Sequence, residues 1–300
     1  MPNLFIPGSA KSGTSSLHEY LNQHPDISMS SEKEPHFFCV KRNKNEAFEY
    51  EKLFENGKKY RGESSTGYMV FHGVPERIKK INANPKFIFL LRNPVDRILS
   101  HYNWLHGQAA ETKAFVDAVK YDMDIEPVFG KKGPGPGYKS YFQWGLYGKW
   151  IEKYIYHFGA ENILVIFSEE LKSRPASVLK KCTDFLELDD FEFNLSAKEN
   201  ISVNVKGKKI FYFLQNYRPD NDSFFLKAYR KNPYFLRKYI SKVRILISNK
   251  YKSKFSDNEL YKLSFDERKW LTDLYANDVT KLKKIINNEI ELWEDFNTTL

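Results

Sequence analysis

Residues 4–16 read Leu-Phe-Ile-Pro-Gly-Ser-Ala-Lys-Ser-Gly-Thr-Ser-Ser, a short apolar run followed by a loop rich in glycine and serine. The run predicts a strand, and apolar residues at Leu17, Tyr20 and Leu21 predict a helix after the loop. Backbone N–H groups and the positive end of a helix converge on such a turn, so the stretch predicts an anion-binding site. The residues expected to contribute are Lys11, Ser12, Gly13, Thr14, Ser15 and Ser16.

The rest of the chain alternates between apolar runs and helical patterns. Residues 87–92 are apolar at every position before Arg92, which predicts a central strand buried on both faces. Pro94 suits the first turn of a following helix. Further strands are expected at 60–63 and 163–167, with helices at 145–157 and 175–186 and a helix or helix pair at 265–293. The alternation predicts an α/β fold, a P-loop-like doubly wound parallel sheet flanked by helices. Residues 129–137, rich in glycine and proline, are expected to form a flexible loop without regular structure.

The charge of the chain is concentrated in one segment. The 300 residues carry a net charge of +9, whereas residues 206–254 hold ten lysines and four arginines against two aspartates, a net charge of +12. Apolar residues recur there at helical spacing from Leu236 to Ile247, so the segment predicts an amphipathic helix. Two interpretations stay open: contact with an anionic membrane surface or acidic polymer, and a solvated helical subdomain packed on the core. We expect a single domain over 1–300 with a basic helical insertion or subdomain at 206–264.

Composition excludes several classes of protein. Two cysteines, Cys39 and Cys182, are too few for a disulfide framework or a cysteine-rich metal site. No run of eighteen apolar residues predicts a membrane-spanning helix, and the first residues do not resemble a signal peptide. We therefore expect a cytoplasmic protein, peripheral to the inner face of the membrane if the basic segment binds lipid. No motif that reads nucleic acid is present, so no nucleic-acid partner is expected.

The loop departs from the nucleotide-hydrolase pattern G-x-x-x-x-G-K-[ST]. Gly8 and Gly13 match, but Thr14 follows the second glycine and the lysine stands two residues before it. The central strand ends in Arg92, which repels a metal and attracts phosphate, so a magnesium-dependent kinase or ATPase is disfavoured and no metal is expected. Arg92 and Ser100, on the following helix, predict a second phosphate site on the same sheet edge. The structural alternative for Arg92 is an ion pair with Asp96.

Three blocks of this sequence resemble the signatures of one enzyme family. Residues 11–16, residues 33–38 (Lys-Glu-Pro-His-Phe-Phe) and residues 92–102, which begin Arg-Asn-Pro, are similar to those of PAPS-dependent sulfotransferases. The similarity is greatest to the carbohydrate and heparan sulfate branch, and a bacterial member is expected. The resemblance implies that PAPS is the sulfuryl donor and that the chain needs no metal.

The resemblance also implies roles for single residues. Lys11 would lie near the bridging oxygen of PAPS, and Arg92 with Ser100 would bind its 3′-phosphate. Glu34 matches the family's general base, with His36 as the other candidate, and a basic loop containing Lys206 and Gly207 would close the nucleotide site. Ser64 departs from the family, since the heparan enzymes often carry lysine there; Lys33 or Lys139 is the expected substitute.

The acceptor is expected to be a hydroxyl group of a glycan or a small molecule. Aromatic rings suit sugar faces, phenols and lipids alike, so the sequence does not choose among them. An amine acceptor and a non-catalytic binder of anionic polymer or membrane on the same fold are the alternatives. The residues expected to hold the acceptor are Glu34, His36, Tyr68, Tyr138, Lys139 and Trp144.

Overall fold

Five parallel strands form the central sheet of the computed structural model, which describes residues 1–107, 110–130, 133–134, 139–196, 203–205, 252–254 and 260–297. Every pairing in this sheet is parallel, and its strand order is β2–β3–β1–β4–β7. The predicted α/β fold with a parallel sheet is confirmed. The strands are β1 (Leu4–Phe5), β2 (Ile27–Met29), β3 (Tyr60–Glu63), β4 (Lys86–Leu91) and β7 (Ile163–Phe167).

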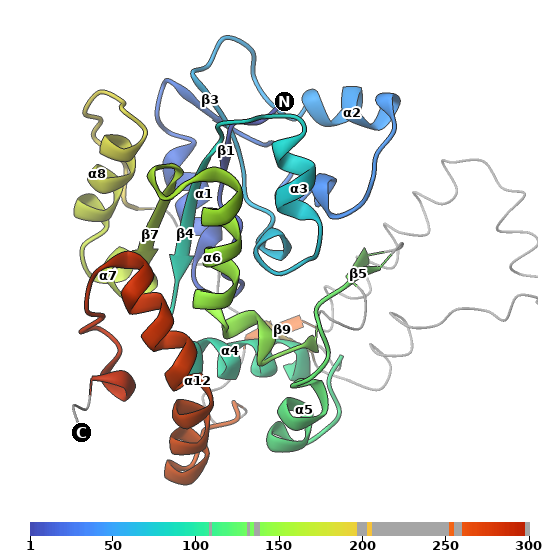
Figure 1. Ribbon diagram of the computed structural model, residues 1–300, viewed down its shortest axis with the longest axis vertical. Coiled ribbons are helices and arrows are strands. Elements are labelled where there is room, and N and C mark those ends of the chain that lie inside the picture. The colour runs from blue at the N-terminus through green and yellow to red at the C-terminus, as the bar shows by residue number, and fades with distance from the viewer. Residues whose placement is uncertain are drawn as a thin grey trace, which may run out of the picture. The chain divides into compact units, whose positions relative to one another are not determined.

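Strand β4 is apolar from Phe87 to Leu91 because helices cover both of its faces. Ile88 and Leu90 belong to a buried cluster that also contains residues of α1 (Thr14–Leu21) and α8 (Pro175–Phe185). The alternate residues, Phe87 and Phe89, contact Tyr154 of α6 (Tyr147–Phe158), with ring centroids 5.0 and 5.1 Å apart. Side chains alternate between the faces of a strand, so this pattern makes the sheet doubly wound. Figure 1 shows these helices around β4.

A long C-terminal helix, α12 (Phe265–Ile286), packs along α6. It begins at a capping box formed by Ser264 and Glu267 and ends at Asn287, whose φ is 50°. The predicted tail is therefore one helix rather than a pair. The other helices are α2 (Lys44–Glu51), α3 (Val74–Lys79), α4 (Pro94–Gly107), α5 (Phe115–Asp122) and α7 (Ser168–Ser173).

Two details differ from the sequence predictions. The glycine- and proline-rich stretch was expected to lack regular structure, yet β5 (Phe129–Gly130) pairs antiparallel with β6 (Gly133–Pro134). Proline is tolerated in a strand that has no neighbour on the side of its missing N–H, which is the case in a two-stranded ribbon. Strand β7 was expected to be buried, but only Ile166 is, because β7 lies at the edge of the sheet.

The chain divides into two compact units, each considered by itself. The first comprises residues 1–101, 116–200 and 263–300 and holds the five-stranded sheet. The second comprises residues 102–115 and 201–262 and contains β8 (Val203–Val205) paired antiparallel with β9 (Lys252–Lys254). Val205 and Lys252, the residues on either side of 206–251, are therefore paired with each other in this two-stranded ribbon.

Most of the predicted insertion at 206–264 lies outside the described residues. Its proposed contact with an anionic membrane and the single-domain organisation stay predictions. Within the part of the chain that the structure describes, no helix is both long enough and apolar enough to cross a membrane.

Candidate functional site

The loop between β1 and α1 presents an uncapped helix N-terminus. Gly13 is the N-cap residue, its φ is 95°, and no side chain caps the helix. A Cβ atom at Gly13 would come no closer than 3.8 Å to Leu90, so the left-handed backbone rather than lack of space requires glycine. The N–H groups of Thr14, Ser15 and Ser16 lie in the first turn and have no intrahelical acceptor. This geometry is typical of an anion-binding site.

Interior contacts fix the shape of the loop. The N–H of Ser9 donates to the carbonyl of Leu90 at 2.7 Å, and the N–H of Leu90 donates to the carbonyl of Gly8 at 2.9 Å. The Ser9 and Ser12 hydroxyls lie 2.5 Å apart, and Ser12 is 1% exposed. The predicted ligand contact of Ser12 is therefore restricted to its backbone N–H, because its side chain points into the protein.

Lys11 and Arg92 lie next to each other at the end of the sheet. Nη1 of Arg92 donates to the carbonyl oxygen of Lys11 at 3.4 Å, and Lys11 has a φ of 72°. Burial, then the charge of Arg92 and more weakly that of Lys33, lower the pKa of Lys11 to about 8, although Glu34 opposes them. A bound anion between the two cations would relieve their repulsion. The loop and the strand end thus form one cationic site.

The alternative role of Arg92, an ion pair with Asp96, is wrong. Asp96 instead accepts a hydrogen bond from Nη1 of Arg268 at 3.0 Å. Within the described residues Arg92 forms no ion pair, and its side chain is half-buried. Its backbone is held by the hydroxyl of Tyr147, which donates to the Arg92 carbonyl at 2.9 Å. The N–H groups of the guanidinium other than the one that bonds to Lys11 are therefore left for a ligand. Ser100, half-buried in α4, follows eight residues later.

Glu34 and His36 lie in a tight turn, with φ values of 57° and 51°. Oε2 of Glu34 lies 3.3 Å from Nε2 of His36, and Oε1 lies 3.3 Å from Nζ of Lys33 and accepts from the Thr66 hydroxyl at 3.1 Å. Burial alone would raise the pKa of Glu34, but His36 and Lys33 outweigh it and hold the pKa below its ordinary value. Glu34 is therefore ionised at neutral pH. Its charge also acts on Lys11, so the carboxylate lies near enough to the cationic site to influence it.

Ser64, where the heparan enzymes often have lysine, belongs to the interior. It is fully buried, and its hydroxyl lies 2.8 Å from Nδ1 of His18. Burial, together with the charge of Lys33, lowers the pKa of His18 to about 4, so this ring is neutral. Of the two expected substitutes, Lys33 contacts Glu34 directly, and Lys139 is half-buried.

Two of the predicted acceptor residues do not reach a surface. Tyr68 and Trp144 are both 0% exposed, so neither side chain contacts solvent, and their assignment as acceptor contacts stays a prediction. The hydroxyl of Tyr68 accepts the N–H of Phe38 at 2.9 Å, and Trp144 packs edge-on against Phe71. Both residues support the site from within, since aromatic side chains next to a functional motif serve the core as readily as a ligand.

Phe129 lies beside the turn that carries Glu34 and His36, and sequence reasoning missed it. Its ring lies 5.2 Å from that of His36 and 5.4 Å from that of Phe71. It begins β5, so the short ribbon abuts the turn that carries Glu34. The only available signal was its place at the start of the glycine- and proline-rich stretch. Tyr138, Lys206 and Gly207 lie outside the described residues, and their roles stay predictions.

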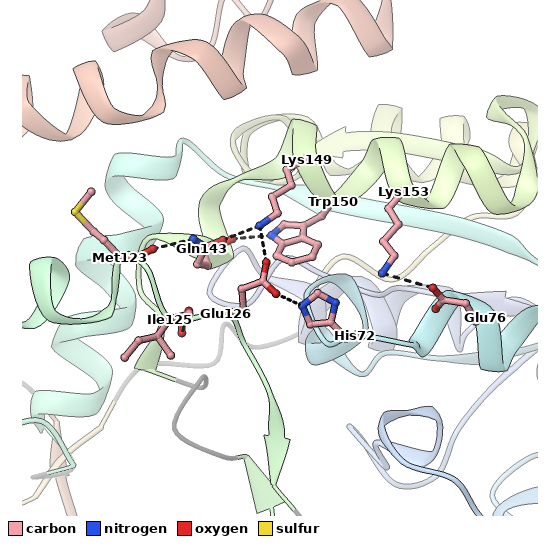
Figure 2. A network of polar contacts seen from close by, with 10 residues as sticks. His72, Glu76, Met123, Ile125, Glu126, Gln143, Lys149, Trp150 and Lys153 are labelled. Carbon is pink, nitrogen blue, oxygen red and sulfur yellow. Dashed lines mark hydrogen bonds and ion pairs between the residues drawn. The ribbon is translucent and has the colours of Figure 1, made fainter.

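A polar network anchors the segment that leads to β5 (Figure 2). Oε2 of Glu126 lies 2.6 Å from Nε2 of His72, and its other oxygen lies 3.5 Å from Nζ of Lys149. Nε2 of Gln143 donates to the carbonyl of Met123 at 2.8 Å and its oxygen accepts from Lys149 at 3.1 Å. The chain on the N-terminal side of Phe129 is thereby tied to α6. Across the described part of the chain, His, Cys, Asp and Glu form no group of three or more that would hold a metal ion.

Comparison with known proteins agrees with this geometry. The sequence profile described as the sulfotransferase domain matches residues 1–252. The mouse heparan sulfate glucosamine 3-O-sulfotransferase 3B1 is 31% identical over 192 residues, which are 63% of this chain and 46% of that protein. The human heparan sulfate glucosamine 3-O-sulfotransferase 5 is 29% identical over 192 residues, 63% of this chain and 54% of that protein. The chain thus matches about half the length of these curated relatives.

Solved structures extend the likeness along the chain. The crystal structure of a sulfotransferase from Alicyclobacillus acidocaldarius has a TM-score of 0.67 and 26% identity, and the match covers 98% of this chain and 99% of that one. Together with the profile match over residues 1–252, this identifies the chain as a member of the sulfotransferase domain family.

Proposed function

We propose that the protein transfers a sulfuryl group from PAPS to a hydroxyl group of a carbohydrate or another small acceptor, releasing PAP. The observation that carries this proposal is the adjacency of Lys11 and Arg92, two cations at the sheet edge, with the ionised Glu34 near enough for its charge to act on Lys11. The cations Lys11 and Arg92 suit an anionic nucleotide, and the carboxylate of Glu34 suits an acceptor group that must lose a proton.

Lys11 and the N-terminus of α1 would stabilise the charge that develops on the leaving phosphate. Sulfuryl transfer resembles phosphoryl transfer, in which a loose in-line transition state gathers charge on the leaving oxygen. A fixed lysine and backbone N–H groups at that oxygen are the stabilisers such a reaction needs. Arg92 and Ser100 would hold the 3′-phosphate and fix the donor for in-line attack.

Glu34 would act as the general base. It accepts the proton of the acceptor hydroxyl as the acceptor oxygen forms its bond to sulfur. The bond between sulfur and the bridging oxygen breaks, and its electron pair stays on the 5′-phosphate of PAP. His36 would orient the Glu34 carboxylate through the 3.3 Å contact, and Lys33 would supply the second cation. An amine acceptor would use the same residues.

The relatives support a carbohydrate acceptor. The names of the mouse and human relatives specify heparan sulfate glucosamine. Lys11, Glu34 and Arg92 lie within residues 1–252, which the sulfotransferase domain profile matches. Phe129 beside His36 provides an aromatic ring at the acceptor side, and such rings stack on sugar faces.

Calorimetric titration with PAP in the absence of metal tests the nucleotide half of this proposal. We expect binding by the wild type and a loss of affinity of about tenfold to a hundredfold in Arg92→Ala, since a charge-assisted contact is removed. Arg174→Ala removes an exposed arginine that pairs with Glu170, and this variant should bind PAP as the wild type does. The absence of PAP binding by folded wild type would refute the proposal. With binding established, PAPS and a panel of glycans, phenols and amines identify the acceptor.

A further inference from the structure

Glu63 is a buried carboxyl that the proposed reaction does not use. It ends β3 and is 0% exposed. The hydroxyl of Ser65 donates to Oε2 of Glu63 at 3.2 Å and accepts the backbone N–H of His36 at 3.0 Å. Two hydrogen bonds therefore connect Glu63 to the turn that carries Glu34.

That turn needs external support. Glu34 and His36 both have positive φ values although neither is glycine. Such conformations cost free energy and persist only where surrounding contacts hold them. On its far side, the N–H of Phe38 bonds to the buried hydroxyl of Tyr68. The hydrogen bond from the N–H of His36 to the Ser65 hydroxyl supports the turn at His36 in the same way.

The surroundings of Glu63 favour its neutral form. Oε1 has no hydrogen-bond partner and is buried, and burial raises the pKa of the carboxyl to about 8, with Glu34 acting in the same direction. The hydroxyl groups of Tyr68, Ser65 and Tyr50 favour the ionised form but only partly offset this rise, and of the three only Ser65 forms a hydrogen bond to Glu63 in the described structure. The titratable groups that interact with it are Glu34, Cys39, Tyr50, Tyr68 and Tyr154. All of these groups are neutral or acidic, so an ionised Glu63 would gain no cationic partner from them.

We propose that Glu63, as a neutral carboxyl acting through Ser65, is the positioning residue for the Glu34–His36 turn. The role rests on the proposed function of Glu34. A neutral Glu63 accepts from Ser65 without placing a second negative charge beside Glu34. Once ionised, Glu63 would repel the Glu34 carboxylate and destabilise the turn. The turn therefore keeps the conformation described above only while Glu63 is protonated.

Infrared spectroscopy tests the protonation without any turnover. Wild-type protein at pH 7 should show the carbonyl band of a buried protonated carboxyl, which titrates near pH 8 and is missing in Glu63→Gln. Glu55→Gln, the same change at an exposed glutamate, should keep the band. If the wild type shows no such band at pH 7, the proposal is overturned.

Amide hydrogen exchange at His36 tests the positioning. Ser65→Ala should speed exchange of this amide by about tenfold or more at constant pH, and Ser65→Thr, which restores the hydroxyl, should return it toward the wild-type rate. Unchanged exchange in Ser65→Ala would also overturn the proposal. Both readouts stand apart from activity, so an absence of sulfuryl transfer would refute the proposed function and leave the test of Glu63 intact.

The pH dependence of turnover provides a third readout. Lys11 loses its proton near the same pH as Glu63, and both losses should lower activity. Wild-type kcat should therefore fall by about a hundredfold per pH unit well above pH 8, and that of Glu63→Gln by only about tenfold per unit, since one proton fewer is lost. Equal slopes would contradict the role of Glu63.

Discussion

Arg268 and Asp295 form a bidentate ion pair, with Nε to Oδ1 and Nη2 to Oδ2 distances of 2.7 Å each. The same carboxylate accepts a hydrogen bond from Nδ2 of Asn93 at 2.7 Å. Nη1 of Arg268 also reaches Asp96 at 3.0 Å. Arg268 and Asp295 thus form hydrogen bonds with Asn93, which directly follows Arg92, and with Asp96 in the first turn of α4. The proposed 3′-phosphate site is therefore braced by residues almost two hundred positions away.

Removal of this brace should weaken nucleotide binding. In Arg268→Ala, Asp295 and Asp96 lose their shared cation, which should lower the free energy of unfolding by roughly 1–3 kcal/mol. PAP affinity should fall by about threefold to tenfold because Arg92 is less well placed. Calorimetry and thermal unfolding measure both effects. Lys281→Ala breaks an exposed pair with Glu152 and is the matched control. Unchanged PAP affinity in Arg268→Ala would show that the brace serves stability alone.

The left-handed conformation at Gly13 predicts a second effect on binding. Gly13→Ala has space for its Cβ, so the expected cost of about 1–2 kcal/mol comes from the backbone alone. The helix N-terminus would shift to relieve it, and PAP affinity should fall by about tenfold. Gly57→Ala, also at positive φ with an open surrounding but far along the chain, should lose similar stability and keep PAP binding. Equal PAP affinities in the two variants would exclude a special role for the Gly13 turn.

Most strands of the sheet could be predicted from the sequence because burial requires an apolar residue at each buried position, which leaves a local pattern. Strand β4 has helices on both faces, so every position from Phe87 to Leu91 is apolar and the run is unambiguous. Strand β2, with three residues, is too short to show a period and was not predicted.

Contacts between residues far apart in the sequence could not be predicted from it. The i, i+4 spacing suggested a pair between Arg92 and Asp96, yet Asp96 bonds to Arg268, which lies 172 residues away. The connection from Glu63 through Ser65 to His36 depends on a turn with positive φ at residues that rarely adopt it. Tyr68 and Trp144 look like ligand-stacking residues in sequence, and only the packing around them shows that they are buried.

Lys11 should control the rate more than the affinity. Lys11→Ala is expected to lower kcat by about a hundredfold to a thousandfold, as the loss of one transition-state donor does elsewhere. Because the pKa of Lys11 is about 8, its charge is lost as pH rises through that value. Lys11→Arg stays charged above pH 8. Its kcat should therefore fall less steeply with pH than that of the wild type, because one proton fewer is lost. Steady-state rates from pH 6.5 to 9.5 measure this, with Lys180→Ala, an exposed lysine, as the control.

Glu34→Gln should separate chemistry from nucleotide binding. Loss of the base should lower kcat by about a hundredfold to ten-thousandfold. PAP affinity should stay equal or improve, since a negative charge that acts on Lys11 is removed. On the acid side of the wild-type pH profile, activity should fall only as pH drops through the lowered pKa of Glu34, below 4.5, because the base must be ionised. An equal loss of PAP affinity and kcat in Glu34→Gln would contradict its role as base.

Stability against pH offers the most selective test of Glu63. Its folded pKa of about 8 lies above the ordinary 4.5, so the folded state holds a proton that the unfolded state lacks, and stability falls as pH rises between these values. His18, with a pKa lowered to about 4, acts oppositely but only below 6.5, and Lys11 raises stability only above 8. Between pH 6.5 and 8 we therefore expect the wild type to lose about 1.4 kcal/mol per pH unit. Denaturant unfolding of Glu63→Gln should show a flat profile in this window, while Glu55→Gln follows the wild type. Parallel profiles in all three proteins would mean that Glu63 is already ionised at pH 6.5.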